Sequence, residues 1–539
     1  MSSYDAIVIG SGINGLVAAA ELSGAGWRVC LVEANDQIGG FIASEELTEP
    51  GYLHDTFSSW HPLFVTGGAH AVLGADLARH GLTYCNTDGA VTGSVAHDGR
   101  VTVAHRDPAE TAAGFSVPDD RASYLAMLER LGGEIEAIGT LLGSEMRGLG
   151  PVRPVLGMVR RGRLSGLESW TRDTVTSGRA WLRREFRGLE ADHLWAPWLL
   201  HAGLSPDSAS GGLMVPLLAG TIHGAGLPVV KGGAGAFLEA FHRLLDERNV
   251  EIRTGHAVER VVVEGGVAIG VEVGGVLLRA RRAVLASVTP AALYEQLLPQ
   301  NAVPDVVRSE ARRFRFGRAA MQVHVALSEP LEWSSPDLAG IPLVHLSDGS
   351  SSTGIACAEA EAGLLPRQPT VVVGQQFLMD PSRVPENTGS LWLQMQEVPY
   401  HPVGDSAGEL EVSAGWTDNL VSGYVERVMG LLERHAPGTT SKVLSTTTLS
   451  PVDLERRNRN AVHGDPYGGS AELDQNLWWR PGPLTGRHRT SIGGLWHIGA
   501  STHPGPGLGG GSGHLVAQAL TGGGPSRRLV DAAKRHIRR

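Results

Sequence analysis

Three glycines near the start of the chain, Gly10, Gly12 and Gly15, have the G-x-G-x-x-G spacing of a phosphate-binding turn. An apolar run at 6–9 precedes them and a helical pattern at 16–25 follows, so the segment predicts a buried strand, a tight turn and a helix. Glycine permits the turn, lets the backbone approach a pyrophosphate and lets helix and strand pack closely. The sequence therefore predicts a dinucleotide site formed by Gly10, Gly12, Ile13, Asn14 and Gly15.

An acidic residue ends the second predicted strand, 27–32. Glu33 is placed to accept hydrogen bonds from ribose hydroxyls, and its charge disfavours the 2'-phosphate of NADP. We expect the neighbouring Ala34 to belong to the same site. Gly39 and Gly40 form a second glycine pair, which lets more backbone come close to the cofactor.

A glycine-rich segment lies near the C-terminus and reads Gly-Leu-Trp-His-Ile-Gly-Ala-Ser-Thr-His-Pro-Gly-Pro-Gly-Leu at 494–508. Together with the second glycine pair and a Lys-Gly-Gly element at 231–233, it resembles the phytoene desaturase/carotenoid isomerase-like group of the flavin amine oxidase superfamily. Within that group the similarity is greatest to the branch called pyridine nucleotide-disulfide oxidoreductase domain-containing protein 2. Pro506 departs from the pattern, because the family usually has glycine there.

This resemblance implies that the cofactor is FAD. It also implies further cofactor contacts from Val258, Gly499, Ala500, Gly507 and Leu508. The C-terminal third of the chain has no cysteine to attach a flavin, so we expect non-covalent binding. No second G-x-G-x-x-G with a strand and a helix is found for a nicotinamide cofactor.

The expected fold class is α/β, with a Rossmann-type FAD-binding domain of the glutathione reductase-like, amine oxidase type, interleaved with an α+β substrate domain. The chain has 539 residues, far above the roughly 250–300 at which one hydrophobic core stops growing. We assign 1–90, 226–290 and 485–525 to the discontinuous FAD-binding domain. The substrate domain is expected at 91–225 and 291–484, with its helical part near 120–225.

The expected reaction takes hydride from a C–H bond of a hydrophobic organic substrate to flavin N5, as in a dehydrogenase, desaturase or oxidase. Oxygen or a quinone-like acceptor would then reoxidise the flavin. Four tryptophans within thirty residues suit an apolar substrate tunnel, although ordinary core packing is the better explanation for any one of them: Trp170, Trp181, Trp195 and Trp198. An amine oxidase, a redox-neutral flavin-dependent isomerase and a non-catalytic flavin-bound scaffold protein remain alternatives.

Three residues are candidates for catalysis. His503 lies in the C-terminal motif that the resemblance places beside the flavin, and His61 follows a segment that approaches the flavin ring in the family. Each can equally be a structural histidine. Lys231 is one of only three lysines in the chain, and ordering of the cofactor-side loop is the alternative to a direct role.

The amino-acid composition limits the kinds of partner that the chain is expected to have. The net charge is −10, which disfavours nucleic acid as a partner. Three cysteines without C-x-x-C spacing indicate neither a metal site nor a disulfide framework, and no secretory signal precedes the first strand, so a cytoplasmic location is expected. Arginines at 160–187 and 527–539 leave a peripheral membrane contact open, with a solvated helix face as the plainer interpretation. A homodimer is also left open.

Overall fold

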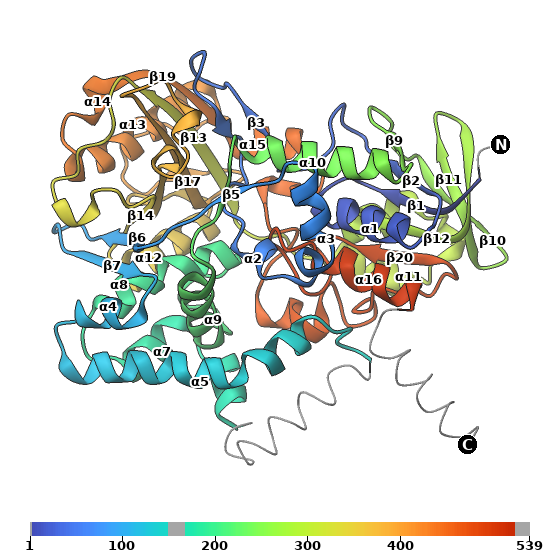
Figure 1. Cartoon of the computed structure of the whole chain (residues 1–539), viewed down its shortest axis with the longest axis horizontal. Helices are drawn as coiled ribbons and strands as arrows, with labels where there is room; N and C mark the ends of the chain where they lie inside the picture. The colour runs from blue at the N-terminus through green and yellow to red at the C-terminus, as the bar shows by residue number, and fades with distance from the viewer. Residues whose placement is uncertain (1–2, 149–167, 523–539) are drawn as a thin grey trace.

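The computed structural model describes residues 3–148 and 168–522, and Figure 1 shows two sheets with helices packed around them. The first sheet has the order β10-β11-β12-β1-β2-β9, and β20 pairs with β12. Its strands are β1 (Ser3–Ile9), β2 (Val29–Val32), β9 (Glu251–Arg253), β10 (Arg260–Glu264), β11 (Val267–Val273), β12 (Val276–Ser287) and β20 (Leu495–Ile498). β1 runs parallel to both β2 and β12, and β20 runs parallel to β12, as in a dinucleotide-binding fold.

Helices from three distant parts of the chain cover this sheet. They are α1 (Ile13–Gly24), α3 (Gly68–Arg79), α10 (Ala234–Glu247) and α16 (Gly511–Thr521). α1 packs against α10 and α16, and their shared core contains Leu16, Val17, Phe237, Phe241 and Val516. α1 begins three residues before the predicted helical pattern at 16–25, because Asn14 and Gly15 already belong to its first turn. The predicted Rossmann-type domain is confirmed.

The second sheet is mainly antiparallel, with the order β19-β13-β17-β16-β14-β6-β7. Its strands are β6 (Ala90–Val95), β7 (Val101–His105), β13 (Ala319–Leu327), β14 (Leu343–Leu346), β16 (Val371–Gly374), β17 (Gly389–Val398) and β19 (Val443–Leu449). Apolar side chains on one face, such as Val323 and Leu393, pack with Tyr424 and Val428 of α13 (Asp418–His435). The other face turns toward the helical part of the chain.

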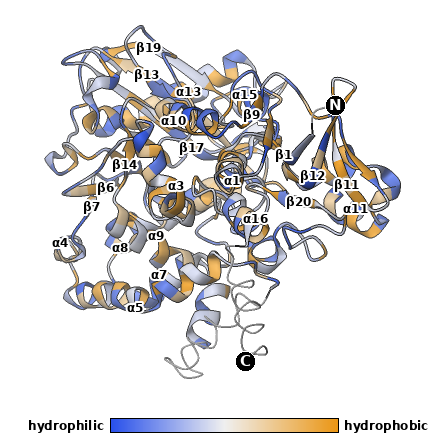
Figure 2. Ribbon diagram, turned by 45° about the vertical axis from the view of Figure 1, so that its right-hand side comes forward, coloured by the Kyte–Doolittle hydropathy of each residue, from blue (hydrophilic) through white to orange (hydrophobic). Residues whose placement is uncertain are grey.

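The helical part comprises α4 (Pro108–Ala113), α5 (Pro118–Leu142), α7 (Gly178–Glu185), α8 (Glu190–Trp195), η1 (Pro197–Ala202) and α9 (Gly211–Ala225). Trp181 and Trp195 are buried in its core, whereas Trp170 lies under the guanidinium of Arg130. Figure 2 shows hydrophilic and hydrophobic residues alternating along α5, as expected for a helix with one solvated face. Two of the predicted basic residues, Arg179 and Arg184, form ion pairs with aspartates. Arg160, Arg161, Arg163 and the tail 527–539 lie outside the described residues.

Short elements connect these layers. The strands are β3 (Ser44–Glu45), β4 (His54–Asp55), β5 (Tyr84–Cys85), β8 (Val229–Val230), β15 (Leu364–Leu365) and β18 (Gly404–Asp405), and the helices are α2 (Pro62–Val65), α11 (Asp305–Arg312), α12 (Ser350–Glu361), α14 (Thr439–Lys442) and α15 (Pro451–Arg457). Single turns of 3-10 or π helix occupy 292–297, 300–302, 336–338, 376–378, 381–383, 462–464, 473–475 and 477–479. Among the described residues, no helix is both long and apolar enough to cross a membrane.

Candidate functional site

The glycine turn between β1 and α1 uses each of its glycines differently. Gly10 has φ +87, in the left-handed region that favours glycine. A Cβ on Gly15 would overlap the carbonyl oxygen of Gly10, so this position holds the turn against the helix. Around Gly12 no heavy atom lies within 4 Å of where a Cβ would stand. No side chain caps the start of α1, so its first N–H groups remain available to a phosphate beside Gly12.

Glu33 closes the same turn from the end of β2. Its Oε2 accepts hydrogen bonds from the backbone N–H of Ser11 at 2.8 Å and from the Ser11 hydroxyl at 2.6 Å. Its Oε1 accepts from the backbone N–H of Asn35 at 2.9 Å. Ala34 is half-buried beside it, and Val258 packs against the core of the first sheet. Contact of Glu33, Ala34 and Val258 with a nucleotide remains a prediction.

The second glycine pair lies directly against the turn. Gly39 has φ +121, and its N–H donates to the carbonyl oxygen of Ser11 at 3.1 Å. A Cβ on Gly40 would stand 3.4 Å from the Cα of Gly12. This close approach of two backbone segments explains why small residues recur here.

The C-terminal segment completes the same region. β20 ends at Ile498, the next residue, Gly499, has φ +110, and the chain turns back into α16. The N–H of Gly513 donates to the Asn14 side-chain oxygen at 3.2 Å, and a Cβ on Gly513 would overlap the Asn14 carbonyl oxygen. α16, like α1, has no side-chain cap at its start. The N-termini of two helices therefore lie side by side, which favours negative charge between them.

A cavity of about 300 Å³ connects this region to the second sheet. Nine of the predicted cofactor residues line it: Gly12, Ile13, Asn14, Gly39, Gly40, Gly499, Ala500, Gly507 and Leu508. The opposite wall consists of side chains from η1, α9, β17 and the segment after β4, including Phe57, Trp60, Trp198, His201, Leu218, Ile222, Trp392, Gln394 and Gln396. Gly10, Gly15, Glu33, Ala34 and Val258 do not line the cavity. One site therefore uses both sheets.

The predicted catalytic histidine of the C-terminal motif is turned away from this cavity. His503 is 2% exposed, and its Nε2 donates to the Leu142 carbonyl oxygen of α5 at 2.8 Å. The His503 carbonyl oxygen accepts from His488 at 2.8 Å. Burial lowers the pKa of His503 to about 4, so the ring is neutral near pH 7. These contacts tie the C-terminal turn to α5.

The other two candidates also lie outside the cavity walls. His61 is buried, its Nδ1 is 3.1 Å from the Tyr84 hydroxyl, and its ring packs edge-on against Phe237. Burial lowers the pKa of His61 to about 4. Lys231 has an exposed side chain just before α10. A catalytic role for these three residues has no support in their positions and remains a prediction.

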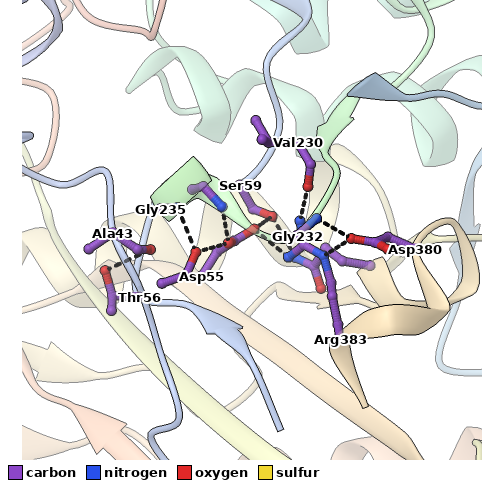
Figure 3. A network of polar contacts seen from close by, with 12 residues as sticks. Ala43, Asp55, Thr56, Ser59, Val230, Gly232, Gly235, Asp380 and Arg383 are labelled. Atoms are coloured by element: carbon purple, nitrogen blue, oxygen red, sulfur yellow. Dashed lines mark hydrogen bonds and ion pairs between the residues drawn. The ribbon is translucent and has the colours of Figure 1, made fainter. Parts of the chain in front are cut away.

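A buried ion-pair network joins the two halves of the molecule (Figure 3). Arg383 donates to Asp55 at 2.7 Å, to Asp380 at 3.3 Å and to the Val230 carbonyl oxygen at 2.7 Å. Asp380 accepts from the N–H of Gly232 at 2.7 Å. Burial alone would raise the pKa of Asp55, yet the Arg383 guanidinium and hydrogen bonds from Ala234 and Ser59 hold it below its usual value. The network fixes the Lys-Gly-Gly element.

Sequence reasoning missed this network and the polar part of the cavity wall. Asp55 and Arg383 are 328 positions apart, and nothing local marks them as partners. Gln394 and Gln396 do carry a signal, since polar and apolar residues alternate along 393–396. That alternation predicts a strand with one polar face, but it does not say that the face lines a cavity.

The parallel sheet, the open glycine turn and the cavity that reaches the second sheet define a dinucleotide-binding fold joined to a second domain. The profile described as "Flavin containing amine oxidoreductase" matches residues 13–506, and the chain belongs to this family. It is therefore a flavin-dependent oxidoreductase, and the predicted relationship is confirmed.

Individual relatives agree with this assignment. Pyridine nucleotide-disulfide oxidoreductase domain-containing protein 2 of Rattus norvegicus is 27% identical over 96% of this chain and 93% of its own length. Phytoene desaturase (neurosporene-forming) of Cereibacter sphaeroides is 24% identical over 98% and 97%. A double mutant of putrescine oxidase has the same fold, with a TM-score of 0.62 and 16% identity over 96% and 99%.

Proposed function

We propose that the chain binds FAD non-covalently and uses it to remove hydride from a C–H bond in the apolar part of an organic substrate. The observation that carries the proposal is one continuous cavity, which runs from the open glycine turn to a wall of aromatic and aliphatic side chains. One end suits a dinucleotide and the other suits a substrate. Oxygen or a quinone-like molecule is the proposed final electron acceptor.

The residues of the first domain fit FAD. The start of α1 and the open space at Gly12 would hold the pyrophosphate, and Gly499, Ala500 and the start of α16 would lie along the flavin. A bound flavin supplies a two-electron acceptor for hydride. Non-covalent binding is supported by the cysteines, since Cys30, Cys85 and Cys357 do not line the cavity.

The second domain would position the substrate. Trp198, Leu218 and Ile222 present apolar surface to the cavity, which excludes water and fixes the orientation of a C–H bond. The cited phytoene desaturase supports a desaturase-like reaction. An amine oxidase is the rival from the same family, and an isomerase would consume no acceptor.

The first test is the visible spectrum of the purified protein, followed by heat release and identification of the chromophore. The proposal expects a flavin spectrum and release of intact FAD by heat. Anaerobic addition of apolar alkenes and alcohols should then bleach the flavin, and air or a soluble quinone should restore the colour. A colourless protein that cannot be reconstituted with FAD would contradict the cofactor. Flavin that only amines reduce would favour the amine oxidase.

A matched pair of variants distinguishes flavin bound at the proposed site from flavin that is bound non-specifically. Gly12→Ala adds a methyl group to the space assigned to the pyrophosphate, whereas Gly89→Ala adds one at an exposed bend outside the cavity. We expect Gly12→Ala to be purified without flavin and Gly89→Ala to be purified with it. Equal flavin content in both variants would contradict the assigned location.

A further inference from the structure

The cavity wall contributed by β17 is polar, in contrast to the opposite face of the same strand. Trp392, Gln394 and Gln396 alternate along β17 and line the cavity. Leu391, Leu393 and Met395 point the other way and pack into the core beneath α13. The register of the sheet therefore presents two amide side chains to an otherwise mostly apolar chamber.

The polar atoms of this wall are only partly paired. Gln396 donates to the Gln394 side-chain oxygen at 2.9 Å, while the Gln396 side-chain oxygen has no partner among the described residues. The amide NH₂ of Gln394 likewise donates to no residue in the part of the chain that the structure describes. These side chains belong to residues only 3% (Gln394) and 5% (Gln396) exposed, so bulk water does not reach them freely. Both residues line the cavity.

Three indole groups add further donors. The indole N–H groups of Trp60, Trp198 and Trp392 are buried and have no partner within residues 3–148 and 168–522. All three tryptophans line the cavity. With the Gln394 amide, these indoles give the walls unpaired N–H donors among the described residues, and the unpaired acceptors include the Gln396 oxygen. Because buried donors need acceptors, a ligand with an oxygen atom fits this wall better than a hydrocarbon does.

The charged side chains near the wall already have hydrogen-bond partners within the protein. Asp465 lines the cavity, and its oxygens accept from the N–H groups of Gly317, Tyr467 and Gly469 at 2.7 to 2.8 Å. Arg480 lies behind this turn and donates to the carbonyl oxygens of Ala500, Tyr467 and Ser470. Both side chains are therefore committed to holding backbone. Neither offers a free charge to a ligand.

A pair of histidines adds further titratable groups at the cavity wall. His201 lines the cavity, and its Nε2 lies 3.0 Å from Nε2 of His345 on β14. Burial lowers the pKa of His201 to about 3, and burial also lowers that of His345. A neutral His201 can exchange a hydrogen bond with an uncharged ligand. It supplies no positive charge to bind a carboxylate.

We infer that the substrate is an uncharged amphipathic molecule, with an apolar body and one hydroxyl or carbonyl oxygen held by the Gln394 amide and the indole N–H groups. The inference rests on the proposed function, because that function makes the bound molecule a substrate. Binding of the molecule can be measured without turnover. The apolar body would pack on Leu218 and Ile222 of α9. Cationic amines and carboxylates would enter without a counter-charge and bind poorly.

Four probes of equal chain length test the inference on the holoprotein: 1-octanol, 2-octanone, octanoate and octylammonium. Binding is followed by tryptophan fluorescence, because Trp198 and Trp392 line the cavity, and by equilibrium dialysis. We expect the alcohol and the ketone to bind at least about tenfold more tightly than either charged probe. Tighter binding of octanoate or octylammonium would overturn the inference.

Variants assign the contact to Gln394. Gln394→Leu keeps the approximate size and removes the amide, so binding of 1-octanol should weaken about tenfold. Gln375→Leu is the control, because Gln375 is equally buried beside the same sheet, its side chain donates to the Ile341 carbonyl oxygen, and it does not line the cavity. Its binding of 1-octanol should not change. Equal effects of the two substitutions, or none, would overturn the assignment.

A second variant tests the inference even if Gln394→Leu fails to fold. Trp198→Phe removes one indole N–H and keeps an aromatic wall, and it should weaken both neutral probes several-fold by dialysis while leaving the charged probes unchanged. Unchanged binding of the neutral probes in this variant would contradict the role of the donors. If the purified chain takes up no FAD but the probes still follow the expected order, the proposed function fails and the binding site stands.

Discussion

The two walls of the cavity are built by different means. On the cofactor side, backbone atoms from three distant segments meet at glycines, and Gly15 and Gly513 leave no room for a Cβ. On the substrate side, side chains project from β17, η1 and α9. Substitutions on the first wall should therefore disturb folding or cofactor binding. Substitutions on the second wall should change the ligand while the fold persists.

The largest expected effect on stability is at the buried ion-pair network that joins the two halves of the molecule. Arg383→Met leaves Asp55 and Asp380 buried without their cation, which should lower the free energy of unfolding by about 3–5 kcal/mol. Arg315→Met is the control, because Arg315 pairs with Asp474 on the surface, and it should cost less than about 1 kcal/mol. Denaturant unfolding measures both. Similar losses in the two variants would mean that the walls are not coupled here.

Alanine substitutions at two glycines of the same turn should have different effects on stability and on FAD affinity. Gly15→Ala forces a methyl group onto the Gly10 carbonyl oxygen and should destabilise the flavin-free protein by about 1–3 kcal/mol. Gly12→Ala meets no protein atom, so the flavin-free protein should unfold within about 0.5 kcal/mol of the parent. Its affinity for FAD should nevertheless fall at least about tenfold. A Gly12→Ala protein that is unstable without flavin would contradict the assignment of that space to the cofactor.

Acid should destabilise the protein through its buried neutral histidines. The pKa of His503 falls from 6.5 to about 4 on folding, so the unfolded chain binds its proton first. Its contribution to stability is therefore complete above pH 6.5 and is lost at about 1.4 kcal/mol per pH unit as the pH falls toward 4. His503→Gln should reduce the acid slope by that amount. Thermal unfolding from pH 7 to pH 4 measures it.

The same variant tests the alternative role of His503. Because this ring lies outside the cavity and bonds to Leu142, flavin reduction by a substrate should change less than about threefold in His503→Gln. A loss of two orders of magnitude in the reduction rate, with bound FAD intact, would show that His503 acts in catalysis after all.

The smallest effect is expected at Lys231. Its side chain is exposed, and the backbone of the next residue, Gly232, makes the contact with Asp380. Lys231→Met should alter the free energy of unfolding by less than about 0.5 kcal/mol and leave FAD affinity unchanged. Flavin titration and denaturant unfolding check this. A tenfold loss of affinity would assign the lysine to the cofactor wall.

The first wall was largely predictable because its chemistry is local. Strand, glycine turn, helix and Glu33 follow one another within about thirty residues, and each turn needs glycine for a stated reason. The C-terminal segment could be connected to that turn only through a family resemblance. No property of Gly513 by itself indicates that it lies against Asn14.

The second wall was less predictable because it depends on which way side chains point. The motif placed His503 near the cofactor, yet its ring turns toward α5. Tryptophans clustered in sequence divide between core and cavity, and only Trp198 of the four lines the cavity. Gln394 and Gln396 come from a strand whose polar face the sequence indicates, but only the assembled sheet shows that this face lines the cavity.

The contact between α1 and α16 has a consequence for biosynthesis. Asn14 and Gly513 are 499 positions apart, so a ribosome adding roughly 5–20 residues per second needs roughly 25–100 s between them. During that interval β12 has no β20 beside it, and the side of α1 that packs on α16 is uncovered. The cofactor region of the nascent chain is incomplete until α16 has been made. Chaperone occupancy should therefore fall only after α16 has left the ribosome.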